Sequence, residues 1–514
     1  MLTHLEKKGE MTMKKESKRT FVVIGLLLGI LMAAMDNTIV ATAMGTIVSE
    51  LGGLDQFIWV TSAYMIASVA GMPIFGKLSD MYGRKLFYVS GLLLFLIGSI
   101  LCGLAQNMVQ LSLFRAIQGL GGGALMPIAF TIMFDTFPPE QRGKMSGLFG
   151  AVFGISSVFG PLLGAYITDY IDWRWVFYVN VPLGLVSLLF IGKFYFESLE
   201  HREQKIDWWG AILLVSSVLC LMFALELGGK EYAWDSVVII SLFGGFAVFL
   251  ALFFLAETKA TDPVIPFYLF KKRLFATAQG IGFLYGATFI LGTIFIPIFV
   301  QGVYGGTATN SGLILTPMML GSVVGSQIGG RFAAKTSYRN LMIISGILFL
   351  TGIYLLSTLT ADTARSVVTI YMIITGIGVG FSFPLLSMSS IHGLDMRERG
   401  TANSTNTFFR SIGMTLGVTI YGTIQNHLLM NKLETALPMM KKFNPSGDSR
   451  ALLSKEARAH IPKEILQKIV DSLADSIATM FAWATIPVIV AIILIFLMGP
   501  ARLTDQFTAT KKAQ

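Results

Sequence analysis

Long hydrophobic runs, separated by short polar or glycine- and proline-containing breaks, follow one another along almost the entire chain. A helix needs roughly 20 apolar residues to cross a hydrocarbon core of about 30 Å, and about fourteen of the runs reach that length. The pattern therefore predicts an all-α membrane protein. The expected spans lie near residues 21–43, 58–76, 87–105, 109–131, 145–168, 175–195, 208–227, 236–256, 274–300, 310–330, 340–358, 366–388, 404–427 and 477–499.

Basic residues mark every second connection between these spans, starting with the segment 14–19 ahead of the first span. Because Lys and Arg near the end of a span resist translocation, these connections and both chain ends are expected on the cytoplasmic side of the cell membrane. Composition agrees, since 54% of the residues are hydrophobic, 13% are charged and the mean hydropathy is +0.68. The net charge of +9 then reflects orientation and indicates no nucleic-acid partner.

Glycines and a proline recur after a shift of about 257 residues, which indicates an internal repeat. The aligned positions are Gly119, Gly121, Gly123 and Pro127 with Gly376, Gly378, Gly380 and Pro384, followed by Arg142 and Gly143 with Arg399 and Gly400. Parallel repeats give transporters two similar halves around a central site. We therefore expect a cytoplasmic tail (1–20), a six-helix bundle (21–195), a linker with two inserted helices (196–257), a second six-helix bundle (258–500) that includes an extracellular loop (428–476), and a cytoplasmic tail (501–514).

Two charged residues stand inside expected spans, where an ionisable group is costly and is a functional candidate by default. Asp36 is the only charge in the run 21–41, and Arg115 lies in the fourth span with Gln118 on nearly the same face. Both charges are expected in the outer half of the membrane, so they are interpreted as ion-pair partners or as members of one network. A buried pair with a purely structural role is the alternative.

The connection after the second span, GKLSDMYGRK at 76–85, has the features of a charged hinge. Its glycines permit a tight chain reversal, and its carboxylate suits basic residues or a helix N-terminus. We interpret it as a conformational latch formed by Gly76, Asp80, Gly83, Arg84, Lys85 and Arg142. A solvated loop that only carries the orientation signal is the alternative. Ala334 stands where Asp80 would align in the repeat, so the latch is expected to be asymmetric.

The fifth span carries small residues about four apart, together with a proline. They are Gly154, Gly160, Pro161 and Gly164. Small residues let helices approach closely, and the proline removes a backbone donor and bends the helix. Because Val418 replaces the proline in the second half, we interpret this span as a gating helix, with glycine packing of no special function as the alternative.

Aromatic and polar residues of several spans are candidates for an adaptable apolar cavity. They are Trp59, Tyr64, Gln118, Glu226, Phe283, Tyr285, Phe381 and Asn406. Glu226 is also interpreted as a carboxylate at the membrane interface. Arg410, on the face of Asn403 and Asn406, is expected to anchor its helix at the inner interface. The histidines are scattered, so neither a metal site nor an enzyme active site is predicted.

Taken together, these motifs resemble the major facilitator superfamily, and within it the fourteen-span drug:proton antiporters, over nearly the whole chain. The loop at 76–85, the stretch 115–123 and the segment GPLLGA at 160–165 match signature motifs of that family. So do MDNTIV at 35–40 and WRWVF at 173–177.

The resemblance implies two six-helix bundles related by a pseudo-two-fold axis, with two inserted helices. It also implies a monomer without a cofactor that exports amphipathic, often cationic drugs in exchange for protons by alternating access. Asp36 would carry the proton and Arg115 would modulate it. The alternatives are a lipid, glycolipid or metabolite exporter of the same fold, and a membrane sensor or scaffold that transports nothing.

Overall fold

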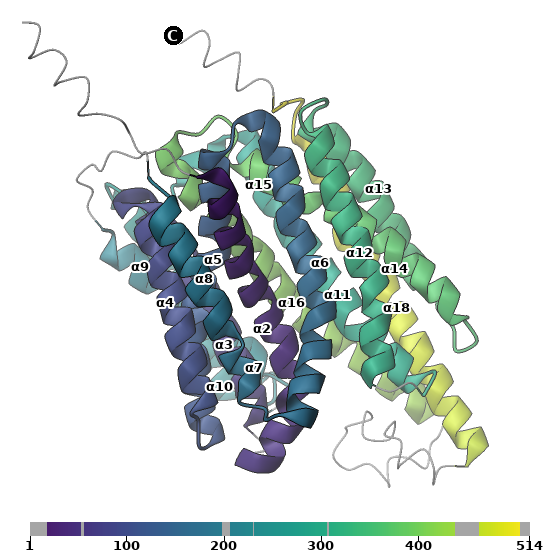
Figure 1. Ribbon diagram of the computed structural model, residues 1–514. Coiled ribbons are helices and arrows are strands. Elements are labelled where there is room, and N and C mark those ends of the chain that lie inside the picture. The colour runs from purple at the N-terminus through teal and green to yellow at the C-terminus, as the bar shows by residue number, and fades with distance from the viewer. Residues whose placement is uncertain are drawn as a thin grey trace, which may run out of the picture.

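The computed structural model describes residues 18–52, 56–197, 206–229, 231–305, 308–436 and 462–503. The expectations for the tails 1–17 and 504–514 and for the loop 437–461 lie outside the described residues. Within the described ranges every helix-length apolar run forms a helix, which confirms the all-α prediction (Figure 1). Thirteen of these helices are long and apolar enough to cross a membrane. A fourteenth, α16 (Arg399–Ala436), is more polar because hydroxyl and amide residues crowd its first turns.

The first half of the chain forms a bundle in which the last crossing is divided into two helices. Its helices are α2 (Arg19–Leu51), α3 (Phe57–Tyr82), α4 (Arg84–Gly103), α5 (Met108–Thr136), α6 (Pro139–Tyr170), α7 (Trp175–Tyr178) and α8 (Asn180–Phe194). The last crossing is interrupted at Val179, because Pro182 has no N–H to donate to the carbonyl of Tyr178. Pro73, Pro127 and Pro161 are tolerated inside the other helices.

The inserted pair, α9 (Trp208–Leu227) and α10 (Val237–Lys259), lies against one side of the first bundle. Buried apolar side chains of α9, such as Leu214 and Val218, pack against Ile66 and Val69 of α3. In contrast, α10 buries only 11% of its most apolar window. Its Glu257 carboxylate accepts the backbone N–H of Val264 (3.0 Å), which fixes the segment that leads through η2 (Phe267–Lys271) into the second half.

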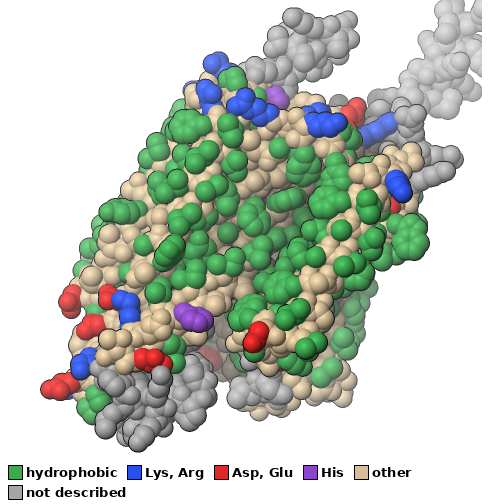
Figure 2. Space-filling model, turned by 180° about the vertical axis from the view of Figure 1, so that it is seen from behind, with side chains coloured by type: hydrophobic (Ala, Val, Ile, Leu, Met, Phe, Trp, Pro, Cys, Tyr) green, Lys and Arg blue, Asp and Glu red, His purple; other side chains and the backbone are tan. Residues whose placement is uncertain are grey.

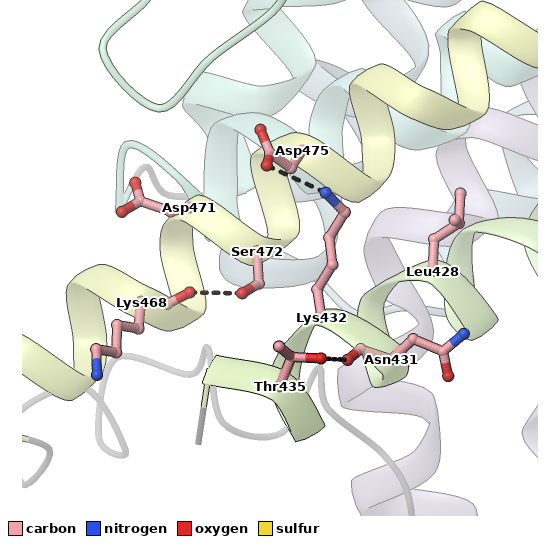
Figure 3. Close-up of a pocket in the computed structure, with 8 residues that line it drawn as sticks. All are labelled: Leu428, Asn431, Lys432, Thr435, Lys468, Asp471, Ser472 and Asp475. Carbon is pink, nitrogen blue, oxygen red and sulfur yellow. Dashed lines mark hydrogen bonds and ion pairs between the residues drawn. The ribbon is translucent and has the colours of Figure 1, made fainter. Parts of the chain in front are cut away.

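The second half repeats the arrangement with α11 (Arg273–Gly302), α12 (Ala308–Phe332), α13 (Tyr338–Leu356), α14 (Arg365–Gly380), α15 (Ser382–Ser390), η3 (Met396–Glu398), α16 and α18 (Lys463–Leu497). The break between α14 and α15 falls at Phe381, ahead of Pro384. Both α16 and α18 extend well into the expected loop 428–476. Their extensions bury Leu433 and Leu473 and enclose a polar cleft that Figure 3 shows.

The internal repeat is visible in the helix packing. On α5, Gly119 and Gly123 lie against the backbone of α3, at Tyr64 and Ser68. The equivalent glycines of the second half lie against the backbone of α12 in the same way, Gly376 at Met318 and Gly380 at Ser322. A Cβ at any of these glycines would overlap a main-chain atom, so only glycine allows this approach.

Hydrophobic side chains cover the middle of the face that Figure 2 shows, and charged side chains gather at the two ends of that face. Large hydrophobic residues are likewise exposed on α18, among them Trp483, Ile489 and Phe496. A soluble protein rarely exposes so continuous an apolar surface, whereas a bilayer requires one.

Both halves meet at one end of the molecule, which we call the closed end; α2 begins there and α18 ends there (Figure 1). Two crossings between the halves lie at this end. Gly143 of α6 contacts Gly330 of α12, and Gly76 of α3 contacts the backbone of Gly400 on α16. Arg142-Gly143 and Arg399-Gly400 are aligned in the repeat, so the two crossings are pseudo-symmetric.

Toward the opposite end, which we call the far end, the helices exchange partners. Gly154 of α6 still contacts Val323 of α12, but Gly160 and Gly164 lie against Thr38 and Thr42 of α2. In the same way, α16 first contacts α3 and then, at Gly413 and Gly417, contacts α11. The two halves are therefore joined at the closed end and packed internally toward the far end.

Candidate functional site

A buried polar network surrounds Asp36 inside the first bundle. Its carboxylate forms an ion pair with Arg115 of α5, and both side chains are fully buried. The same carboxylate accepts hydrogen bonds from Gln118 Nε2 (2.7 Å) and Asn180 Nδ2 (3.2 Å). Charged and neutral donors thus converge on one acid, so its buried oxygens are hydrogen-bonded.

Arg115 is held from several sides. Its Nε donates to the carbonyl of Val60 (3.1 Å), and its Nη1 also donates to Gln118 Oε1 (2.8 Å). Its guanidinium lies 4.3 Å from the ring centroid of Tyr64, a favourable cation–π distance. The expected partnership of Asp36, Arg115 and Gln118 is therefore present as geometry, and Tyr64 belongs to it as well.

Two members of this network were not singled out from the sequence. Ser99 Oγ accepts from Gln118 Nε2 (3.2 Å) and Asn180 Nδ2 (3.0 Å) and donates to the carbonyl of Phe177 (2.8 Å). Asn180 Oδ1 is buried and has no hydrogen-bond partner among the described residues. An amide at the start of an apolar crossing was the available signal, because an amide in lipid needs partners.

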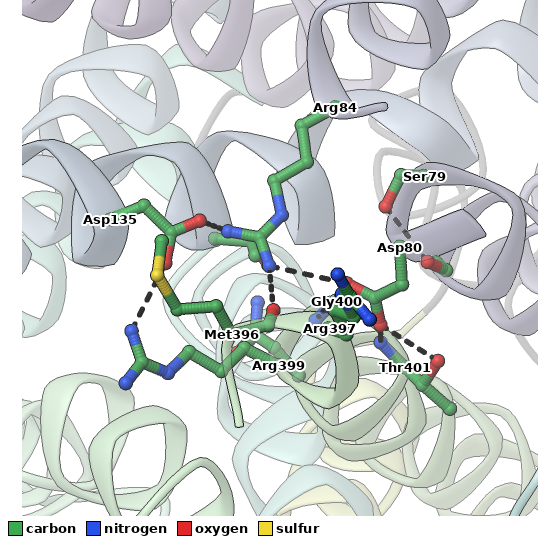
Figure 4. Close-up of polar contacts among 12 residues, drawn as sticks. Ser79, Asp80, Arg84, Asp135, Met396, Arg397, Arg399, Gly400 and Thr401 are labelled. Carbon is green, nitrogen blue, oxygen red and sulfur yellow. Dashed lines mark hydrogen bonds and ion pairs between the residues drawn. The ribbon is translucent and has the colours of Figure 1, made fainter. Parts of the chain in front are cut away.

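At the closed end, Asp80 links α3 to the first turn of α16, as Figure 4 shows. Its carboxylate accepts the backbone N–H groups of Gly400 (2.9 Å) and Thr401 (2.6 Å) and the Thr401 hydroxyl (2.9 Å). The first N–H groups of a helix have no partner within it and carry the positive end of its dipole. Asp80 therefore caps a helix that belongs to the other half.

Arg84 extends this contact to further helices. It pairs with Asp80 (3.3 Å) and with Asp135 at the end of α5, and it donates to the carbonyl of Met396 in η3 (Figure 4). Asp135 also pairs with Arg399 of α16 (3.1 Å). Met396, Asp135, Arg399 and Thr401 were not predicted as members of the latch. Their positions at helix ends give no signal until the halves are brought together.

The remaining latch candidates act within the first half. Gly83 adopts a φ of 111°, which lets α3 reverse directly into α4. Lys85 Nζ donates to the carbonyl of Gly192 in the last turn of α8 (2.7 Å) and to that of Tyr195 just beyond the helix (2.8 Å). Arg142 Nε donates to the carbonyl of Phe137 (3.2 Å). Of the six candidates, Gly76, Asp80 and Arg84 contact the second half directly in the contacts given above.

The expected gating helix is α6. Its glycines divide into two sets, since Gly154 lies against α12 of the other half whereas Gly160 and Gly164 lie against α2. Pro161 is in the second set and is half-buried. Pro161 therefore lies beyond the point at which α6 leaves α12. It belongs to the segment of α6 that packs against α2, the helix that carries Asp36.

The cavity candidates do not form one group. Trp59 contacts Phe223 of the inserted helix α9 with ring centroids 5.6 Å apart, and Glu226 is half-buried near the end of α9. Tyr285 is buried in the second bundle, where its hydroxyl meets Ser345 Oγ (3.2 Å).

Three further candidates belong to the second half. Phe381 is buried against Gly329 of α12, and Phe283 is half-buried beside Gly413. Asn406 Nδ2 donates to the carbonyl of Ala278 (3.2 Å) and to Gln279 Oε1 (3.2 Å) on α11. These contacts place Asn406 on the face of α16 that joins α11.

The expectation that Arg410 anchors α16 at the membrane interface is wrong. Arg410 lies eleven residues into α16, about 16 Å from its start at 1.5 Å per residue. Only 9% of its surface is exposed, and its guanidinium lies 5.1 Å from the ring centroid of Phe383 on α15. Because its guanidinium is buried against α15, Arg410 does not extend from the protein surface as an interfacial anchor would.

The fold and the site together define a class: a multi-pass membrane protein of two repeated helix bundles, with a buried charge network in one bundle and a cluster of charged contacts between the two. Comparison with protein families agrees. The model of the Major Facilitator Superfamily matches residues 26–418. The chain belongs to this superfamily, which confirms the resemblance drawn from its motifs.

Relatives in the same superfamily cover the chain from end to end. Multidrug resistance protein 3 of Bacillus subtilis (strain 168) is 61% identical over 508 residues, which are 98% of this chain and 99% of the relative. Multidrug transporter protein MdtP of the same strain is 38% identical over 518 residues, covering 96% and 95% of the two chains.

Solved structures support the fold. The human organic anion transporter MFSD10 (TETRAN) superposes with a TM-score of 0.62 at 14% identity, covering 93% of this chain and 100% of that one. A bacterial homolog of the human lysosomal transporter Spinster gives a TM-score of 0.57 at 17% identity, covering 93% and 96%. At this identity the likeness shows the architecture alone.

Proposed function

We propose that this chain is a proton-coupled antiporter that exports amphipathic, cationic drugs by alternating access. The names of the two Bacillus relatives support drug export. The observation that carries the coupling is the fully buried Asp36–Arg115 pair, together with the amide donors that converge on it. Protons are the second substrate, and the protein works as a monomer in lipid without a cofactor.

Asp36 acts as the proton carrier in this proposal. In the described conformation the carboxylate contacts donors on Arg115, Gln118 and Asn180. Uptake of a proton cancels its Coulomb attraction to Arg115 and turns one of its oxygens into a donor. The unmet Oδ1 of Asn180, whose amide already contacts Asp36, supplies an acceptor for that new O–H after a rotation of the amide.

Antiport requires the proton and the drug to favour different states of the transporter. A cation in the central region is attracted by an ionised Asp36 and loses that attraction when the acid is protonated. Release of Arg115 from the acid also changes the contact between α2 and α5 within the bundle. Asp36 therefore couples the charge of the site to the packing of the first half, with Arg115 as the modulator.

The latch and α6 provide the two-state element. The two crossings at the closed end join the halves, while α6 and α16 leave their cross-bundle partners toward the far end. A rocking motion about these helices opens the closed end when Asp80 leaves the N-terminus of α16. Gly76, Gly83, Lys85 and Arg142 support the hinge, and Pro161 with Gly154, Gly160 and Gly164 supports the movement of α6.

We place the closed end in the cytoplasm of the producing cell. Basic residues are concentrated there, and this orientation follows from the tendency of Lys and Arg to stay on the cytoplasmic side. Both chain ends are then cytoplasmic. The remaining cavity candidates, Trp59, Phe283, Tyr285, Phe381 and Glu226, would then line or border the path as the halves move.

The test uses purified protein in proteoliposomes that contain a pH-sensitive dye, with ethidium as the amphipathic cation. Addition of ethidium to wild-type vesicles is expected to drive proton movement. Asp36→Asn is expected to abolish that movement while the protein still inserts and elutes as a single species. Unchanged coupling in this variant refutes the proton role of Asp36.

Asp475→Asn is the matched control, because it removes a carboxylate that is 60% exposed at the far end. It is expected to leave coupling at the wild-type level. Asp36→Glu, which keeps the acid, covers the case in which Asp36→Asn fails to fold. It is expected to retain measurable coupling. If a folded Asp36→Glu protein shows no coupling, a carboxylate at this position is not sufficient, and the proposal is contradicted.

A further inference from the structure

Arg410 is a buried arginine without an acidic partner among the described residues. Its guanidinium has one neighbour of suitable chemistry, the ring of Phe383 at 5.1 Å. Its aliphatic stem lies on Gly286 of α11, where a side chain would collide with it. A cation–π contact is weaker than the penalty for removing a charge from water, so this arginine is incompletely compensated.

The same face of α16 holds further unmet polar groups. Asn403, two turns before Arg410, donates to the carbonyl of Pro127 (2.9 Å), but its buried Oδ1 has no partner among the described residues. Gln279 of α11 accepts from Asn406, and its buried Nε2 likewise has no described partner. Buried polar atoms are nearly always hydrogen-bonded, so these two atoms mark a polar region along α16 and α11 that can take up further partners.

Arg410 and Gln279 both offer donors, and the arginine adds a positive charge. The group that satisfies them is an acceptor with negative charge, such as a carboxylate or a sulfonate, which an arginine binds through paired N–H donors. Phe383 contacts Phe289 with ring centroids 6.1 Å apart, and both rings are half-buried. These rings provide an aromatic surface beside the charge for an apolar body.

We propose that Arg410 is the specificity-determining residue of a second substrate subsite, in the second half, for amphipathic aromatic compounds that carry an acidic group. The inference rests on the proposed function as an exporter and extends its substrates beyond cations. The acid of such a compound pairs with Arg410, and its aromatic frame rests on Phe383. Gln279, which bonds Asn406 one turn earlier on α16, offers a further donor.

The test measures equilibrium binding to the purified full-length protein in detergent by fluorescence polarisation, without a gradient or transport. The probes are rhodamine B, which has a carboxylate, and its ethyl ester, which lacks that charge. Arg410→Gln is expected to weaken rhodamine B binding by about tenfold to a hundredfold and to leave ester binding within about twofold. Arg410→Lys is expected to retain part of the preference for the acid.

Arg365→Gln is the matched control, since Arg365 also lies over an aromatic ring, Tyr304 at 5.2 Å, but at the far end of the bundle. It is expected to change neither affinity. Equal losses for both dyes in Arg410→Gln, unchanged affinities, or a wild-type protein that does not bind rhodamine B each overturn the proposal. Because binding needs no proton movement, a failure here is distinct from failed coupling in the Asp36→Asn experiment.

Folding does not obscure the result. Arg410→Gln removes an incompletely compensated buried charge, so the thermal midpoint of the variant is expected to equal or exceed that of the wild type. A midpoint well below wild type, with both dyes bound more weakly, assigns Arg410 a structural role and contradicts the proposal.

Discussion

The two halves share a glycine skeleton and differ in where they place their polar groups. In the first half, Asp36 and Arg115 lie inside the bundle with their partners around them. The repeat places Met372 at the position of Arg115 and Thr375 at that of Gln118, so the second bundle has no such centre there. Its polar side chains instead follow the face of α16, where Asn406 stands at the position of Phe149.

This difference in the placement of polar groups suits the two halves to different proposed tasks. The network around Asp36 offers a partner to either charge state of the acid, because donors surround the carboxylate and the unmet Oδ1 of Asn180 can accept from a protonated acid. Unmet groups between helices can be completed only by something that enters from outside. The first half is therefore suited to coupling, and the second is suited to recognition.

The largest expected effect on stability comes from replacing Arg115 of the first half by methionine, the residue at the equivalent position of the second half. Arg115→Met leaves Asp36 as a buried carboxylate without its cation, which is expected to destabilise the protein by about 3–5 kcal/mol. The yield of folded protein and its thermal midpoint in detergent measure this loss. Adding Asp36→Asn to Arg115→Met removes the stranded charge and is expected to restore most of the midpoint, and a double variant no better than the single one contradicts the pairing.

The latch offers the same comparison at the closed end. Asp80→Ala places alanine at the crossing of α3 and α16, as in the second half, where Ala334 aligns with Asp80. It removes a charged cap on two backbone N–H groups, and the loss of about 2 kcal/mol is expected to depopulate the closed state about thirtyfold.

The measurement is the alkylation rate of Ser404→Cys, a fully buried position against Gly76, in a background without Cys102 and Cys220. Asp80→Ala is expected to raise that rate. Ser79→Ala is the control, because the Ser79 hydroxyl bonds only to the carbonyl of Gly76 within α3 (2.8 Å). Equal rates in the two backgrounds indicate that Asp80 does not hold the crossing.

An effect of comparable size is expected at the second crossing, which lacks an acid at the position equivalent to Asp80. Gly330→Ala places a methyl group against the backbone of Gly143, and overpacking of this kind costs about 1–3 kcal/mol. Drug transport is expected to fall because the closed end no longer shuts fully. Gly192→Ala is the matched control, since a Cβ there meets open space, and equal transport by the two variants contradicts a role for this glycine contact.

Much of this architecture could be predicted from the sequence. A helix that crosses a bilayer needs a long apolar run, and close helix packing needs regularly spaced glycines, so both can be recognised within one segment. Asp36 and Arg115 stood out for the same reason, as charges within apolar runs. Asp135 and Arg399 did not, since a charge at a helix end is ordinary until the other half meets it. Arg410 was misplaced because the polar start of α16 made the helix seem to begin later than it does.

The smallest expected effect separates the halves at the far end. In the first half, Glu50 accepts from Arg174 (2.7 Å) and from the indole of buried Trp173 (2.7 Å). In the second half, Lys432 forms an ion pair with Asp475 (3.1 Å), and both side chains are more than a third exposed. An isolated exposed pair contributes about 0–1 kcal/mol, whereas the indole bond of Glu50 is partly buried.

Lys432→Met is therefore expected to leave the thermal midpoint almost unchanged, and Glu50→Met, which removes the acceptor of the Trp173 indole N–H, is expected to lower it measurably. High salt sharpens the distinction, because it screens the exposed pair and leaves the indole hydrogen bond largely intact. If 1 M NaCl removes the difference between the two variants, both contacts are simple surface pairs. A difference that persists in salt shows that the hydrogen bond between Glu50 and the buried indole of Trp173 stabilises the first half at the far end.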